Sequence, residues 1–138
     1  QYLDLSFEKK KISKNKIIEM EIKKTGKLFS FCCMAPAIIK KKNLKEINFF
    51  ANIGAKIGLL FQIADDLIDF KGTSKVAGKI TGKDKKKGKA TLISLLGYKN
   101  AIKYSNKIKS KIIQDLNKYG SRSKNIDETL DYILTRKK

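Results

Sequence analysis

Residues 49–70 read FFANIGAKIGLLFQIADDLIDF, and this stretch decides the fold. Before Asp65 it is apolar nearly all round a helix, a pattern typical of a helix buried inside a bundle. Counted as a helix, it places Gln62, Asp65, Asp66 and Asp69 at i, i+3, i+4 and i+7, which is one face. The stretch therefore predicts a core helix that ends in an acidic face.

The acidic face predicts a site for a hard divalent cation. Asp65 and Asp69 are like charges one turn apart, which destabilises an exposed helix by roughly 0.2–0.5 kcal/mol. The cost grows in an apolar setting, because an ionised carboxylate removed from water needs a compensating partner. Oxygen-only ligands favour Mg²⁺ or Ca²⁺ over zinc, so Asp65, Asp66 and Asp69 are the candidate metal ligands. A solvated helix end is the other interpretation of the same residues.

The stretch Lys71 to Lys89 differs in kind from the rest of the chain. Its four glycines predict a loop rather than a helix, and its eight lysines are opposed by a single acid, Asp84. Such a loop could close over a metal-bound diphosphate, with Lys79 or Lys89 supplying charge, or it could be a solvated connection. Nothing in it matches a Walker A loop or a dinucleotide fingerprint, so nucleotide hydrolysis is not indicated.

The remaining sequence predicts helices and no strands, so the expected fold class is all-α. One helix should run from about Lys14 into Ile39, capped by Ser13, and the core helix should begin at Lys42 or Asn43. The apolar faces of the first helix include Ile17, Met20, Leu28, Phe31 and Met34. Later helices are expected over Ala90–Leu96, Tyr98–Tyr119 and Asp127–Arg136, with breaks at Gly97 and Gly120.

The tripeptide Lys24-Thr25-Gly26 falls inside the first predicted helix. A glycine there costs about 1 kcal/mol relative to alanine, so it can mark a kink or a close helix crossing. Alternatively, Lys24 and Thr25 direct an ammonium and a hydroxyl at an anion in the bundle core. Both interpretations stay open at this point.

Length and composition indicate one domain with an anionic partner or substrate. The 138 residues, 41% of them hydrophobic, can bury a core, and the formal net charge is +19. A general lysine bias of the source would explain this charge equally well. The absence of histidine excludes zinc triads and Ser–His or Cys–His catalysis. Cys32 and Cys33 are expected to be buried thiols in a reducing compartment.

No signal peptide is visible, and the apolar part of residues 49–64 is too short to span a bilayer. We therefore expect a cytoplasmic protein without stable membrane insertion.

Several motifs together resemble one family. The motifs are Gln1-Tyr-Leu-Asp4, Lys24-Thr25-Gly26, residues 58–69 (GLLFQIADDLID) and Gly78-Lys79. With them the chain resembles the C-terminal half of a trans-isoprenyl diphosphate synthase, and the resemblance is specific because it combines KTG, FQxxDDxxD and GK. The spacing of the loop glycines and the tail Tyr132–Arg136 resemble the bacterial farnesyl and geranylgeranyl diphosphate synthases. The similarity covers essentially the whole chain.

The resemblance implies an all-α helical bundle of the isoprenoid synthase type and a transferase of isoprenoid biosynthesis. In the family, Mg²⁺ ions held by two aspartate-rich motifs grip the diphosphate of an allylic substrate. The C–O bond ionises, isopentenyl diphosphate attacks the allylic cation, and a proton is lost. The metals and lysines stabilise the charge that develops on the departing diphosphate.

The resemblance also implies a role for each matching residue. Asp65 would ligate one Mg²⁺, with Asp66 and Asp69 as direct or water-mediated partners. Lys24 and Lys79 would hold the allylic diphosphate, while Thr25 and Gln62 would lie near the carbocation. Supporting contacts to the substrate or the pocket wall would come from Phe61, Gln1 and Asp4.

The family's first DDxxD motif and the arginine pair that follows it do not occur in this sequence. We expect residues 1–138 to be the C-terminal part of a polyprenyl synthase domain, homodimeric as a full-length protein and inactive in condensation on its own. A non-catalytic regulatory subunit of the prenyl-synthase type is an alternative. A basic module that binds nucleic acid or an anionic surface is another, and it predicts steep salt dependence with little effect of Asp65→Ala. The synthase interpretation involves no nucleic acid.

Overall fold

The structure, a computed structural model, describes residues 12–76 and 91–136. Every regular element in these two ranges is helical, which confirms the all-α prediction. In chain order the elements are α2 (Lys14–Glu21), the π-helix η1 (Ile22–Gly26), α3 (Lys27–Ile39), α4 (Leu44–Val76), α5 (Leu92–Leu96), α6 (Tyr98–Leu116), the 3-10 helix η2 (Asn117–Ser123) and α7 (Lys124–Thr135).

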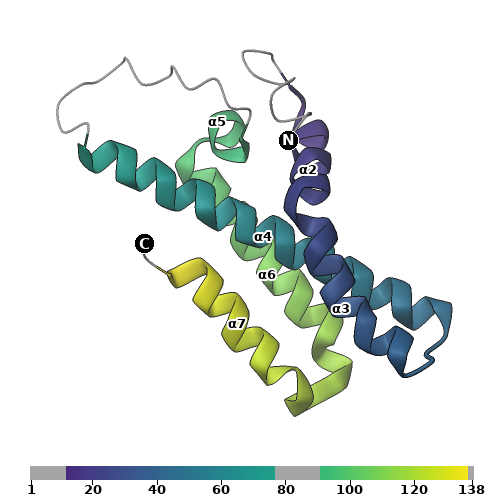
Figure 1. The fold of residues 1–138 in the computed structure, drawn as a ribbon. Helices are drawn as coiled ribbons and strands as arrows, with labels where there is room; N and C mark the ends of the chain where they lie inside the picture. Colours follow the sequence, from purple (N-terminus) through teal and green to yellow (C-terminus); the bar gives the residue numbers. More distant parts are fainter. Residues whose placement is uncertain (1–11, 77–90, 137–138) are drawn as a thin grey trace.

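Helix α4 is the central element, and the other helices pack around it (Figure 1). It crosses the molecule diagonally, with α3 beside its N-terminal half and α6 and α7 along one side. Helices α2 and α5 contact it as well. The predicted core helix is therefore confirmed, and residues of its acidic end contact other helices of the bundle.

Two apolar clusters hold α4 in place. The larger joins α4 to α6 and α7 through Ile53, Ile57, Leu60, Ala64, Ile112, Leu116, Leu130 and Ile133. The smaller joins α4 to α2 and α5 through Ile17, Leu59, Ile63 and Leu92. Because each fully buried aliphatic side chain contributes roughly 1.5–3 kcal/mol, these two clusters fix the helices against one another.

Ion pairs add to the packing on the α6 side. Lys56 of α4 lies 2.6 Å from Asp115 of α6, and Lys109 of α6 lies 2.6 Å from Asp131 of α7. The first pair joins α4 to α6 and the second joins α6 to α7. Together with the larger apolar cluster, they set the position of α7 and of its C-terminal end.

A glycine contact brings η1 against α4. A Cβ placed on Gly58 would lie 2.6 Å from the Cα of Gly26, a distance that real Cβ atoms do not reach. One turn earlier in α4, Gly54 lies against the carbonyl of Phe29, and the Ser30 hydroxyl donates to the Ala51 carbonyl at 2.9 Å. The backbones of η1 and of the start of α3 therefore lie directly against the backbone of α4. The close-crossing interpretation of Gly26 is confirmed.

The element boundaries differ from the predictions at several points. Helix α4 continues to Val76, so Lys71 and Gly72 belong to the helix and the predicted loop begins too early. Its start is set by Asn43, whose side-chain oxygen accepts from the Glu46 N–H at 2.9 Å. Helix α2 begins after Ser13 as predicted, but the Ser13 side chain makes no capping bond.

The C-terminal boundaries differ less. The predicted Ala90–Leu96 helix begins at Leu92, capped by Thr91 and Ser94. Helix α6 ends at Leu116, and η2 replaces its expected last turn, with Gly120 at φ 55°. The last helix begins at Lys124, three residues before its predicted start.

The apolar stripe predicted on the first helix is only partly covered. Ile17 and Met20 are buried, but Leu28 and Phe31 are 67% and 57% exposed. Ile38 and Ile39, about two turns beyond Phe31 in α3, are exposed as well. Cys32 is also exposed and Cys33 half-buried, which corrects the prediction of two buried thiols. One side of α3 thus carries apolar groups that the described residues do not cover.

Helix α4 is longer than the span expected from the sequence. By length and apolar composition alone, Leu44–Gly72 could cross a membrane, which corrects the statement that the apolar stretch is too short. Its contacts with α2, α3, α5, α6 and α7 are nevertheless those of a bundle's core helix.

The glycine contact gives a direct test of the packing. We predict that Gly58→Ala lowers the free energy of unfolding by about 1–3 kcal/mol, because the new methyl group must push apart two backbones. Gly72→Ala is the matched control on the same helix: nothing lies within 4 Å of its Cβ, and it should raise the free energy by about 0.5–1 kcal/mol. Urea denaturation followed by circular dichroism measures both. Equal effects of the two substitutions would contradict the close crossing.

Candidate functional site

Three elements meet at the C-terminal half of α4. The helix itself carries Gln62 and the three aspartates, η1 brings Lys24 and Thr25 from one side, and the end of α7 arrives from the other (Figure 1). The glycine contact between Gly26 and Gly58 lies one turn before Gln62, so it fixes how closely η1 approaches this part of α4.

The π-helical turn links the two sequence motifs by hydrogen bonds. The Thr25 hydroxyl donates to Gln62 Oε1 at 3.2 Å, and Gln62 Nε2 donates to Asp66 Oδ1 at 3.3 Å. A π-helix has a wider turn than an α-helix and often occurs at functional sites, because it changes the direction in which side chains point. The KTG and DDxxD motifs, far apart in sequence, thus belong to one polar chain.

The Asp66 carboxyl holds its proton unusually strongly. Its pKa is raised from 3.8 to about 6, mainly by burial and to a smaller extent by the negative charges of Asp69 and Asp65. The hydrogen bond from Gln62 and the positive charge of Lys24 act in the opposite direction. A carboxyl with this balance has too little positive charge around it for its degree of burial, and a bound cation would supply what is missing.

The Asp65 carboxylate already has a cationic partner. Arg136, the residue after α7, donates from its guanidinium to Asp65 Oδ1. The same guanidinium lies over the ring of Phe61, with its central carbon 4.1 Å from the ring centroid. Phe61 also packs against Phe29 of α3, at a ring-centroid distance of 5.4 Å. Arg136 therefore contacts Phe61 and Asp65 of α4 at the same time.

The donor set matches a hard cation in its chemistry but is not gathered around one point. All three candidate ligands offer carboxylate oxygens, the atoms that Mg²⁺ prefers. Within residues 12–72 and 91–136, however, no three acidic or thiol side chains cluster as a metal site would need. Asp65 engages Arg136, Asp66 engages Gln62, and Asp69 is exposed. A cation here would require these side chains to turn toward it.

The structure places most, though not all, of the predicted site residues. It brings together Thr25, Phe61, Gln62, Asp65 and Asp66, with Lys24 exposed and close enough to influence Asp66. Gln1, Asp4, Lys79 and Lys89 lie outside the described residues.

One participant, Arg136, was not predicted as a site residue. Its signal in the sequence is its rarity: it is one of two arginines among 32 basic residues, the other being Arg122. A planar guanidinium binds a carboxylate and stacks on an aromatic ring better than an ammonium does, so a rare arginine in a lysine-rich chain points to such a contact.

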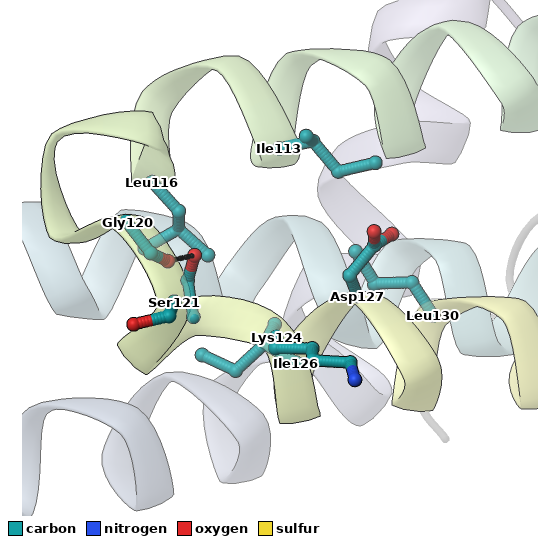
Figure 2. A pocket seen from close by; sticks show the side chains of 9 residues that line it. Ile113, Leu116, Gly120, Ser121, Lys124, Ile126, Asp127 and Leu130 are labelled. Carbon is teal, nitrogen blue, oxygen red and sulfur yellow. Dashed lines mark hydrogen bonds between the residues drawn. The ribbon is translucent and has the colours of Figure 1, made fainter.

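A separate recess lies at the other end of α7 (Figure 2). It has a volume of about 250 Å³ between the end of α6, η2 and the start of α7. Four of its nine lining residues are aliphatic, and the one acid among them, Asp127, lies 3.6 Å from Lys109. The Ser123 hydroxyl closes its turn by donating to the Gly120 carbonyl at 2.8 Å. None of the predicted site residues lines this recess.

Comparison with known proteins gives a consistent result. The chain is 31% identical to a farnesyl diphosphate synthase from Micrococcus luteus, over all of this chain and 47% of that protein. Its fold resembles that of a farnesyl/geranylfarnesyl diphosphate (FPP/GFPP) synthase from Zymomonas mobilis, with a TM-score of 0.77 and 32% identity over 96% of this chain and 43% of the other.

A geranyltransferase from Helicobacter pylori, complexed with magnesium and isoprenyl diphosphate, matches with a TM-score of 0.73 and 27% identity, over 97% of this chain and 44% of the other. The chain thus spans slightly less than half the length of these relatives. Residues 1–133 match the polyprenyl synthetase family. With the helical fold and the joined KTG and DDxxD motifs, this match shows that the chain belongs to that family.

Proposed function

We propose that this chain supplies the second aspartate-rich side of a Mg²⁺-dependent prenyltransferase site. The reaction is the condensation of isopentenyl diphosphate with an allylic diphosphate to a short-chain polyprenyl diphosphate. The observation that carries the proposal is the bonded chain Thr25–Gln62–Asp66, which joins the two motifs across the glycine contact. Family membership supports the same reaction class, and the magnesium complex of the H. pylori relative supports the metal.

Each residue of the site has a task in this proposal. Asp65, Asp66 and Asp69 would hold Mg²⁺, and the bound metal would supply positive charge to the diphosphate leaving group. Lys24 lies exposed beside the acids and binds a diphosphate oxygen, with Lys79 as a second, sequence-predicted cation.

The neutral residues act on the organic part of the substrate. Thr25 and Gln62 present oxygen dipoles that favour positive charge, and the Phe61 ring face does the same for an allylic cation. These tasks require that the substrate lie along the C-terminal half of α4. The homodimer and the cytoplasmic location stay predictions.

The proposal predicts metal-dependent diphosphate binding that requires both motifs. Isothermal titration of inorganic pyrophosphate with Mg²⁺ should show binding that Asp65→Ala weakens at least about tenfold, because a metal ligand is lost. Lys24→Ala should weaken it by roughly three- to tenfold, because one charge-assisted hydrogen bond is lost. Lys107→Ala, an exposed lysine on α6 with the same charge change, is the matched control and should have no effect.

Other outcomes would favour the alternative functions. Pyrophosphate binding that survives Asp65→Ala and falls steeply with salt would favour a basic anion-binding module. A regulatory subunit makes a different prediction. Pyrophosphate binding would be lost in Asp65→Ala, but no condensation would occur when the other half of a relative, with the family's first aspartate motif, is added. Since the relatives are about twice this length, binding rather than turnover is the primary measurement.

The raised pKa of Asp66 predicts a pH dependence of folding. Between about pH 4 and pH 6 the folded state keeps the Asp66 proton that the unfolded state has lost, so stability falls as the pH rises through this window. Well above pH 6 both states are ionised and the loss is complete. From the difference between 3.8 and about 6, the loss is at most about 3 kcal/mol.

Asp66→Asn should abolish this loss, so that it stabilises the protein at pH 7 relative to wild type but not at pH 4. Urea midpoints at the two pH values measure it. Glu128→Gln removes an exposed carboxylate on α7 and is the control for the charge change. The same pH dependence in Asp66→Asn and wild type would show that Asp66 is ionised normally.

A further inference from the structure

Arg136 occupies the two groups that the proposed function assigns to metal and substrate. Its guanidinium donates to Asp65 Oδ1 and covers the ring of Phe61 at 4.1 Å. The side chain is only 20% exposed, whereas that of Asp65 is 41% exposed. Both groups lie on α4, and Arg136 reaches them from the end of α7. The arrangement is therefore a contact between elements and not a local pair within one helix.

Two cations compete for one carboxylate in this arrangement. With Arg136 in place the charge of Asp65 is compensated, so a divalent ion gains less from binding there and is repelled by the guanidinium. Linkage requires the reverse as well: an ion that binds Asp65 more tightly when Arg136 is absent must weaken the contact of Arg136.

The contact of Arg136 is strong in one part and incomplete in another. The pair with Asp65 is charge-assisted, and the stacking on Phe61 adds to it. Its Nε atom, however, is buried without a hydrogen-bond acceptor among the described residues. A buried donor left unpaired destabilises the bound position of the guanidinium, so Arg136 leaves Asp65 more easily. Asp65, being partly exposed, remains open to an approaching ion from the solvent side.

We propose that Arg136 is a positioning residue that serves as the built-in counter-ion of Asp65 and leaves it when a Mg²⁺-diphosphate binds. This inference rests on the proposed function. Arg136 holds the Asp65 side chain in place before the metal arrives. Its departure frees the carboxylate oxygen and uncovers the Phe61 ring in the same movement. The position of Arg136, at the end of α7, therefore differs between the free site and the site with bound Mg²⁺-diphosphate.

Two arginines in the whole chain make the test direct. In a ¹H–¹⁵N spectrum tuned to the arginine side chains, only Arg122 and Arg136 give Nε–Hε signals, and Arg122→Gln assigns them by subtraction. Wild-type protein is titrated with Mg²⁺ and inorganic pyrophosphate. We expect the Arg136 signal to shift and to exchange faster with water on saturation, while the Arg122 signal stays unchanged.

Binding constants provide the second readout. Arg136→Gln removes the competitor and should tighten Mg²⁺-pyrophosphate binding by roughly three- to tenfold, the net range of one typical hydrogen bond. Arg136→Lys keeps the charge without the planar fork and should fall between wild type and Arg136→Gln. Arg122→Gln changes the net charge equally and should bind as wild type does. Weaker binding in Arg136→Gln would instead make the guanidinium a direct ligand of the diphosphate, and would overturn the counter-ion role.

The outcomes separate this inference from the proposed function. Wild-type binding that does not depend on Asp65, or no binding, would contradict the proposed function and with it the inference. Asp65-dependent binding with an unchanged Arg136 signal would overturn the inference alone, because the arginine then stays on Asp65 while the metal binds. The signal is measured on the wild-type chain, so this outcome does not depend on whether a variant folds.

Discussion

The direct contact between the backbones of η1 and α4 is the constraint on which the site depends. Gly26 and Gly58 allow it, because a single methyl group on Gly58 would lie 2.6 Å from the Cα of Gly26. Helix axes separated by ordinary side chains lie about 8–10 Å apart, and two glycines at the crossing allow a closer approach. The close approach brings Thr25 to Gln62, and through Gln62 to Asp66. Packing and site chemistry are therefore one feature of this fold.

The remaining packing places charge around this contact. The larger core cluster and the Lys109–Asp131 pair position α7, so that Arg136 reaches Asp65. On the opposite side Lys24 lies near Asp66 but does not fully compensate its burial, and the pKa of Asp66 rises to about 6 as a result. The site thus holds one carboxylate paired with a guanidinium and a second that is short of positive charge. Such an uneven distribution suits a ligand that brings its own cation.

The sequence predicted the core helix and the acidic face well, since both follow from the helical period of residues 49–70. It placed the end of that helix too early, because a glycine such as Gly72 is tolerated in an exposed helical turn that neighbouring residues extend. The exposed side of α3 was not foreseen either, since an apolar stripe does not tell which part of the protein covers it. Arg136 was missed because its role depends on where α7 ends in space, and periodicity carries no information on that.

The most direct test of the central claim is paramagnetic broadening by Mn²⁺ in the presence of inorganic pyrophosphate. A Mn²⁺ ion held by the acidic end of α4 should broaden the side-chain amide signal of Gln62 and the backbone amide signals of Thr25 and Asp65. Signals around Gly120, at the opposite end of α7, should stay sharp. Broadening spread evenly over the lysine-rich surface, or confined to residues remote from Gln62, would contradict a metal–diphosphate site assembled across the η1–α4 contact.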